Sequence, residues 1–350
     1  MAYITFQPHD HFSVPTWDGS DSTKTITGMQ FKPDTLWIKR YNGNGHPVFN
    51  NSTQGTAINW LPSGQNTADT TTYVASYTSD GFTLTGNIEN TNNDGDDYVA
   101  ACWKANGGTT SSNTDGSITS TVQANTTSGF SVVTYTGTGL GATVGHGLGT
   151  APKMIITKSM DTADFGGVGN GSILYYTDPW TDGIEMAWNG STWADKDTFW
   201  NDTAPTSTVF SVKSANQTNK SGDDYVAYCF AEKNGFSKMG FYKGNGNVNG
   251  SYIYCGFRPK WLMVKKIDGA ENWFTKQTGL TGFGIGGTLT RTVKYDDNTS
   301  STNCYFNVTA TGFRPTTIDG KANGDGNIYI YMAFADHSIV GSNGTIALAI

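Results

Sequence analysis

The sequence predicts an all-β protein built from three tandem, diverged β-sandwich-like modules. Charged residues make up only 15% of the chain, where about 25% is usual for a soluble domain, whereas glycine occurs 44 times and aromatic residues reach 13%. Val, Ile, Thr, Tyr, Phe and Trp cluster in short runs bounded by Gly, Asn, Asp and Ser, a pattern typical of short strands joined by tight turns. No long run shows the 3.6-residue hydrophobic period of an amphipathic helix.

The modular organisation is indicated by two segments that each occur three times, in the same order. The first reads GMQFKPDTLWIK, GLGTAPKMIITK and GFRPKWLMVKK, with a Pro six residues before a Lys: Pro33 and Lys39, Pro152 and Lys158, Pro259 and Lys265. The second reads GDDYVAACWKA, GDDYVAYCFAE and GNIYIYMAFAD. Its Tyr follows the Pro by 65, 73 and 70 residues (Pro33 to Tyr98, Pro152 to Tyr225, Pro259 to Tyr329). Conserved order and spacing indicate an internal repeat.

These anchors set the expected boundaries of the modules. We expect an N-terminal segment at 1–15, module 1 at 16–105, module 2 at 129–232, module 3 at 235–337 and an apolar C-terminal tail at 338–350. The stretch 106–128 is rich in Gly, Ser, Thr and Asn, which predicts a linker. Each module has room for roughly six to nine strands, a number that suits a sandwich. Modules 2 and 3 follow each other almost directly, which predicts a fixed angle between them.

The last strand predicted in each module is apolar on both faces. In module 1 one face carries Tyr98, Ala100 and Cys102, and the other carries Val99, Ala101 and Trp103. A strand with no polar face is covered on both sides. It therefore either lies between two layers of its module, or turns one face towards another module or subunit.

Charge and hydropathy exclude several classes of partner. Lys and Arg number 22 against 29 Asp and Glu, a net charge of −7, and the basic residues are scattered, so we expect no nucleic-acid partner. No apolar run approaches the roughly 20 residues that span a bilayer, and the start of the chain lacks the features of a signal peptide, so we expect no membrane insertion. The four cysteines are too few for a disulfide scaffold, and Cys102 and Cys229 are predicted to be buried thiols.

A family resemblance is carried by several motifs taken together. They are ITGMQFKPDTLWIKR, DGFTLTGN followed by GDDYVAACWKA, GFSVVTYTGTG with VGHGLGTAPKMIITK, WNDTAPTSTVFSV, DDYVAYCFAEKNGFSKMGFYKGNG, and YIYCGFRPKWLMVKK. As a set, these resemble repeat-bearing virion proteins of marine and freshwater tailed bacteriophages, a domain of unknown function loosely called tail fibre proteins. The resemblance extends from about Thr25 to Asp336. The first eighteen residues and the apolar tail depart from it.

The resemblance implies a location on the phage particle and little about chemistry. The expected function is that of a non-enzymatic virion protein, assembled in the host cytoplasm, in a tail fibre or appendage that recognises or attaches to the host surface. A capsid decoration protein is the alternative, and a carbohydrate-binding module is a second one. The implied partners are other virion proteins, a host-surface glycan, and the protein itself as a homotrimer or other cyclic oligomer.

The polar residues favour turns over catalytic or metal sites. A hydrolase needs paired carboxylates or a nucleophile with a base, whereas Asp94, Asp96 and Asp97 lie in the turn-like NNDGDD. A Ca²⁺ loop is the alternative there, although the twelfth-position Glu is missing. His9 and His11 could hold a metal from one strand face, but a loose, solvated N-terminus is the favoured interpretation. We therefore assign no catalytic, cofactor-binding or metal-binding residue.

Two segments are candidates for contacts with partners. Trp180, Trp188 and Trp193, together with Trp200, lie among small polar residues, and the first three are our candidates for stacking on a host glycan, with core packing as the alternative. The tail residues Ile346, Leu348 and Ile350 are candidates for docking. Their burial would contribute roughly 1.5–3 kcal/mol each. Alternatively, the tail completes a sheet of module 3.

Overall fold

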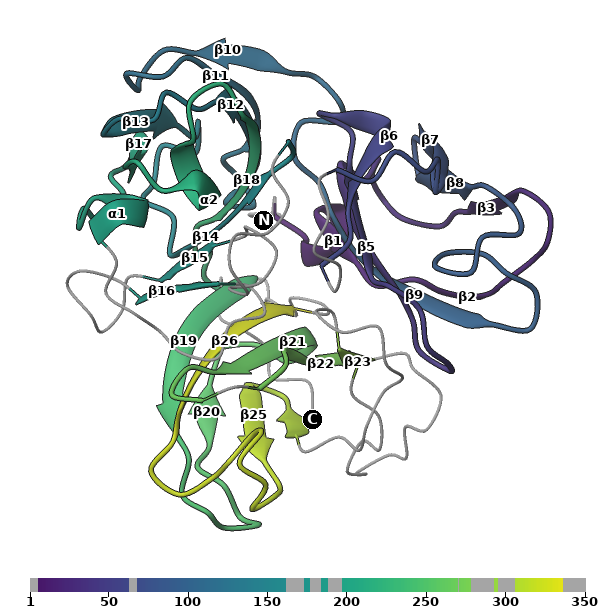
Figure 1. Cartoon of the computed structure of the whole chain (residues 1–350). Helices are drawn as coiled ribbons and strands as arrows, with labels where there is room; N and C mark the ends of the chain where they lie inside the picture. The colour runs from purple at the N-terminus through teal and green to yellow at the C-terminus, as the bar shows by residue number, and fades with distance from the viewer. Residues whose placement is uncertain are drawn as a thin grey trace, which may run out of the picture.

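The computed structural model describes residues 6–62, 68–161, 173–176, 184–187, 197–269, 271–277, 293–294 and 306–335. Three groups of strands surround a common centre, with module 1 in purple and blue, module 2 in teal, and module 3 in green and yellow (Figure 1). Each group contains one large antiparallel sheet and one smaller sheet. The prediction of an all-β, modular, sandwich-like fold is confirmed.

Module 1 is preceded by the short 3-10 helix η1 (Pro8–Asp10). Its large sheet has the order β1-β9-β4-β5-β6, and β2 also pairs with β9. These strands are β1 (Phe12–Ser13), β2 (Thr16–Asp18), β4 (Thr35–Arg40), β5 (Val48–Asn51), β6 (Gly55–Trp60) and β9 (Asp97–Trp103). The smaller sheet contains β3 (Lys24–Ile26), β8 (Gly81–Leu84) and β7 (Val74–Thr78), in that order.

The large sheet of module 2 has seven described strands, in the order β10-β11-β12-β18-β14-β15-β16. The strands are β10 (Ser111–Asn113), β11 (Ser120–Asn125), β12 (Phe130–Thr136), β14 (Met154–Ser159), β15 (Ile173–Tyr176), β16 (Ile184–Ala187) and β18 (Asp224–Phe230). The smaller sheet pairs β13 (Ala142–Gly145) with β17 (Val209–Val212). Two short helices, α1 (Asp197–Trp200) and α2 (Asn216–Asn219), lie beside them.

The predicted linker at 106–128 differs from the structure. Strands β10 and β11 lie within it and extend the sheet of module 2 through the pairing of β11 with β12. The reason is that β11 buries Ser120 and Val122 on one side, whereas Thr121 between them is exposed. A composition rich in Ser and Thr therefore supports strands here as well as it supports a linker.

Module 3 has a large sheet in the order β19-β26-β21-β22-β23. Its strands are β19 (Ser237–Lys243), β21 (Pro259–Lys266), β22 (Phe274–Gln277), β23 (Val293–Lys294) and β26 (Ile328–Ala335). The smaller sheet contains β20 (Ile253–Tyr254), β25 (Gly312–Pro315) and β24 (Phe306–Thr309), in that order.

The repeat is visible in strand order and in register. The orders β2-β9-β4-β5-β6, β12-β18-β14-β15-β16 and β19-β26-β21-β22-β23 correspond one to one, with antiparallel pairing throughout. The residue two positions after each repeated Pro pairs with the residue five positions after each repeated Tyr: Thr35 with Trp103, Met154 with Phe230, and Trp261 with Phe334. The three modules are therefore copies of one framework, as predicted.

Each module buries a core of its own between its two sheets. In module 1, Leu36 and Ile38 of β4 and Cys102 of β9 share a buried cluster with Phe82 and Leu84 of β8. Equivalent clusters fill modules 2 and 3. Only one face of each large sheet is used in this way.

The other faces of the three large sheets meet in a single central core. Trp103, Phe230 and Phe334 hold the same position in their modules, and their rings contact one another pairwise, with centroid distances of 5.9, 5.6 and 6.1 Å. The doubly apolar strands are therefore covered on both sides, as predicted, and the second cover is supplied by the other modules of the same chain. The three modules of one chain thus pack around a common core as three subunits of a trimer would. The doubly apolar strands therefore do not by themselves require contact with another subunit.

The expectation of a loose, solvated N-terminus is wrong for residues 6–15. Strand β1 pairs with β9, and Phe12 and Val14 are buried in the central core. The ring of Phe6 stacks on His11 at 4.8 Å and meets Phe236 of module 3 edge-on at 5.1 Å. In this segment apolar residues are interspersed with polar histidines, so the sequence pattern did not indicate burial. The apolar side chains pack into the central core because burial removes them from water.

Candidate functional site

A recurring polar corner precedes the last long strand of each module. Each corner follows an eight-residue pattern: Thr or Ala, Asn, any two residues, Gly, any two residues, and Tyr. It occurs at 91–98, 218–225 and 322–329. In module 1 the side chain of Asn92 is fully buried. Its Oδ1 accepts the backbone N–H of Ser20 (3.0 Å), and its Nδ2 donates to the carbonyls of Ser22 (2.9 Å) and Thr85 (3.2 Å). One amide thus ties the β2–β3 connection and the end of β8 to the loop before β9.

The tyrosine of the corner holds that same loop from its other end. The hydroxyl of Tyr98 donates to the carbonyl of Glu89 (2.6 Å) and accepts the backbone N–H of Asn93 (3.1 Å). Burial raises the pKa of Tyr98 above its usual value near 10. The hydroxyl therefore stays neutral and acts as a structural donor and acceptor.

Modules 2 and 3 reproduce the corner at equivalent positions. Asn219 and Asn323 are fully buried and accept the backbone N–H groups of Thr138 (2.7 Å) and Asn245 (3.1 Å). Tyr225 and Tyr329 donate to the carbonyls of Asn216 and Gly320, each at 2.5 Å. The intervening glycines, Gly95, Gly222 and Gly326, have φ angles of 79°, 85° and 77°, a conformation that favours glycine. The corner is therefore a folding element that the repeat preserves.

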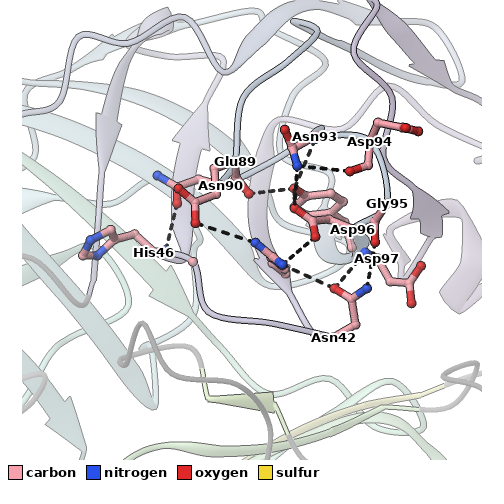
Figure 2. Close-up of polar contacts among 12 residues, drawn as sticks. Asn42, His46, Glu89, Asn90, Asn93, Asp94, Gly95, Asp96 and Asp97 are labelled. Carbon is pink, nitrogen blue, oxygen red and sulfur yellow. Dashed lines mark hydrogen bonds and ion pairs between the residues drawn. The ribbon is translucent and has the colours of Figure 1, made fainter.

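Module 1 adds an ion-pair cluster to its corner (Figure 2). The guanidinium of Arg40 lies 2.5 Å from the carboxylate of Asp96 and 3.6 Å from that of Glu89. Asp96 is largely buried and also accepts the side-chain N–H of Asn93 (2.9 Å). The Oδ1 of Asn42 caps the backbone N–H of Asp97 (3.0 Å).

This cluster accounts for the acidic turn NNDGDD. Its most buried carboxylate, Asp96, is neutralised by Arg40, a charge-assisted pair that holds the turn. The contacts are those of turn chemistry, the interpretation favoured from the sequence. Among residues 6–62, 68–161 and the other described ranges, no group of three or more His, Cys, Asp or Glu side chains is placed to hold a metal ion.

The cysteine thiols of the described residues are buried. Cys102, Cys229 and Cys255 are free thiols, and the burial predicted for the first two is confirmed. Burial raises the pKa of Cys229 and of Cys255 to about 12. Because the thiolate is the reactive form of cysteine, these thiols are packing residues rather than nucleophiles.

Module 2 contains a buried histidine, His146. His146 has no exposed surface; its Nδ1 accepts the N–H of Leu148 (3.2 Å), and its Nε2 lies 3.1 Å from the carbonyl of Thr206. This pairing assigns the hydrogen to Nε2 of a neutral ring. Burial lowers its pKa below 6.5, in keeping with that state.

All six residues predicted to contact partners fall outside the described part of the chain. This applies to the glycan candidates Trp180, Trp188 and Trp193 and to the tail residues Ile346, Leu348 and Ile350. The fourth tryptophan of the cluster, Trp200, is described: it is buried in the core of module 2, edge-on to Phe210 at 6.0 Å. For Trp200 the core interpretation is confirmed.

Sequence reasoning missed the asparagine of the corner and the pairing of Arg40 with Asp96. The first had a readable signal, since an Asn stands six residues before the repeated Tyr in all three modules. The second had none, because Arg40 and Asp96 are far apart in the chain and meet only through the pairing of β4 with β9.

Among the described residues, no helix is long and apolar enough to cross a membrane.

Comparison with known proteins identifies a family. No curated protein and no solved structure matches the chain. A family model described as "Domain of unknown function (DUF7483)" matches residues 7–338, nearly the whole sequence. The chain therefore belongs to the DUF7483 family.

Proposed function

We propose that this protein is a non-enzymatic structural component of a tailed-bacteriophage virion, in a tail fibre or appendage that takes part in host-surface recognition or attachment. The phage location comes from the resemblance of the sequence motifs. The observation that carries a structural role is the shared aromatic core, in which Trp103, Phe230 and Phe334 join three modules into one body. A body of this kind sets fixed distances between its surfaces, which suits a part of a larger assembly.

Hydrogen bonds between the modules support the same conclusion. The Nδ2 of Asn51 in module 1 donates to the hydroxyl of Tyr228 in module 2 (2.9 Å). The Nε2 of Gln123 in module 2 donates to the hydroxyls of Ser52 (3.0 Å) and Thr53 (2.8 Å). Modules tied through both a core and polar contacts form a rigid unit, in contrast to the hinged domains of enzymes that close over a substrate.

Labelling of purified virions tests the location. An antibody against the protein, seen by electron microscopy, is expected to mark the tail or an appendage. A label on the capsid shell would instead support the alternative function, that of a capsid decoration protein. Absence of the protein from purified particles would refute both. Release of reducing sugar from host envelope glycans by the pure protein would refute the non-enzymatic role.

The oligomeric state is part of the same proposal. From the family resemblance we expect a homotrimer or another cyclic oligomer, in contact with other virion proteins. Light scattering on the pure protein at micromolar concentration measures this directly. A monomeric mass would contradict self-assembly, and would be consistent with a chain that already encloses three modules around one core.

A further inference from the structure

A polar cleft of about 330 Å³ lies where the β5–β6 hairpin of module 1 meets strands β11, β12 and β18 of module 2. Thr53, Gln54 and Ile58 form the wall from module 1. The hydrogen bond from Gln123 to Thr53 (2.8 Å) fixes the distance between the two walls. The cleft is therefore part of the rigid connection between the modules.

The opposite wall is a regular array of hydroxyl groups. Thr121 of β11 pairs directly with Thr134 of β12, and Thr136 pairs with Asp224 of β18. Thr119, one residue before β11, also lines this wall. The hydroxyl of Thr136 donates to the carboxylate of Asp224 (2.8 Å).

Much of the hydrogen-bonding capacity of this wall is unused within the chain. Within the described ranges, the hydroxyls of Thr119, Thr121 and Thr134 have no hydrogen-bond partner. Each hydroxyl can both donate and accept. The wall therefore offers several donors and acceptors at spacings set by the sheet.

Comparison between modules indicates that the fold does not require this polar wall. Module 3 has Phe241, Lys243 and Ile328 at the positions that correspond to Thr134, Thr136 and Asp224. In the part of module 3 that is described, β19 has no neighbouring strand in the place that β11 takes beside β12. Module 1 keeps Thr16 and Asp97 at the positions of Thr134 and Asp224, with Asp18 at that of Thr136. Among the described strands, it is therefore the extra strand β11, which contributes Thr121, that is particular to module 2.

We propose that this cleft binds a neutral saccharide. Sugar hydroxyls donate and accept hydrogen bonds, as the threonine hydroxyls and the Gln54 amide do, and the Asp224 carboxylate can accept from neighbouring hydroxyls of a ring. Among the described residues, no Lys, Arg or His lines the cleft, so an anionic ligand would meet the Asp224 carboxylate without a compensating positive charge there. The volume lies at the lower end of the range of small-molecule sites, roughly 300–1,000 Å³, which suits a mono- or disaccharide unit.

This inference does not depend on the proposed virion location. It assigns a glycan contact to the junction of modules 1 and 2, a place distinct from the tryptophan-rich stretch. Saturation-transfer difference NMR on the full chain tests it directly. The probes are glucose, galactose, mannose, N-acetylglucosamine and their β-linked disaccharides, with glucuronic acid and sialic acid as acidic comparisons.

The decisive variant is Thr121→Val with Thr134→Val, which replaces two hydroxyls with methyl groups of similar shape. The matched control is Thr25→Val with Thr83→Val, an exposed pair on the small sheet of module 1 whose hydroxyls lie 3.1 Å apart. We expect saturation transfer to at least one neutral sugar. We further expect the cleft variant to weaken that binding about ten-fold, since it removes two hydrogen bonds, while the control leaves it unchanged.

A second variant keeps the test independent of folding. Asp224→Asn retains the shape of the side chain and removes its charge, and it is expected to weaken the same sugar several-fold with an unchanged melting temperature. The proposal is overturned if no neutral probe shows saturation transfer, if both cleft variants bind as the unmodified protein does, or if the acidic sugars bind as tightly as the neutral ones.

Discussion

Replacing Trp103 with alanine should loosen all three modules, although the residue belongs to module 1. Its side chain is almost fully buried. Its ring contacts the equivalent residues Phe230 and Phe334 and also Trp261, at centroid distances of 5.9, 5.6 and 5.6 Å. Trp→Ala changes in protein cores cost about 3–5 kcal/mol. We expect the upper part of that range, because these neighbours are fixed in the sheets of two other modules and cannot collapse into the space.

The matched control is Phe82→Ala, which removes a fully buried side chain from the core between the two sheets of module 1. Its expected cost in unfolding free energy is also about 3–5 kcal/mol, so the two variants differ in place and not in severity. Urea denaturation gives the size of each effect. Hydrogen exchange under native conditions shows where it spreads, because local opening reports the stability of each region. The Trp103 variant should increase amide exchange in β18 and β26, whereas the Phe82 variant should affect module 1 alone.

A third variant, Trp103→Phe, separates the effect of lost side-chain volume from the effect of the buried indole N–H group. The Nε1–H of Trp103 has no acceptor among the residues that the structure describes. Phenylalanine keeps most of the packing and removes that unsatisfied donor, so we expect a cost below about 1.5 kcal/mol. The idea of a shared core would fail if Trp103→Ala left exchange in β18 and β26 unchanged, or if its cost were below about 1 kcal/mol, far from the core values.

Three further predictions follow from the corner, from its tyrosines and from the tail. Asn323→Ala should destabilise the protein by about 1–3 kcal/mol in urea denaturation, because it leaves the Asn245 N–H and two carbonyls without their partner; exposed Asn307→Ala is the control, and equal effects would contradict the assignment. Burial raises the pKa of Tyr98 in the folded state, so its contribution is complete below the unfolded pKa near 10 and is lost as the pH rises through the folded pKa. The urea midpoint should therefore decline above pH 10, and Tyr98→Phe should decline less; parallel declines would refute this. Deletion of residues 342–350 should abolish particle incorporation or oligomerisation at an unchanged melting temperature, and a normally assembled deletion variant would exclude docking by Ile346, Leu348 and Ile350.

The corner shows how far a linear pattern reaches. The repeated Tyr and its strand could be predicted because Tyr98, Tyr225 and Tyr329 recur with apolar neighbours at fixed spacing. The buried asparagine six residues earlier recurs as regularly, yet Asn is also a common turn residue, so its pattern alone does not distinguish a buried clamp from an exposed turn. Its role follows from the three loops that its side chain joins.

The candidate saccharide cleft depended wholly on tertiary structure. Thr121 and Thr134 lie in segments whose composition suggested a linker and an ordinary strand, and they become neighbours only through the pairing of β11 with β12. Thr53 and Gln54 reach the same cleft from another module. No local sequence pattern predicts that these residues lie together, because they belong to different strands and modules and have no regular spacing in the chain.

By itself, the sequence determined the all-β class, the three copies, the positions of the repeated Pro and Tyr, and the need to cover both faces of the last strands. These are properties of local periodicity and composition, which each module carries within its own segment. Only the tertiary structure decided what covers the second face. Trp103, Phe230 and Phe334 could have met other subunits; they meet one another instead, because three apolar sheet faces on one chain can bury one another without the entropic cost of bringing separate chains together.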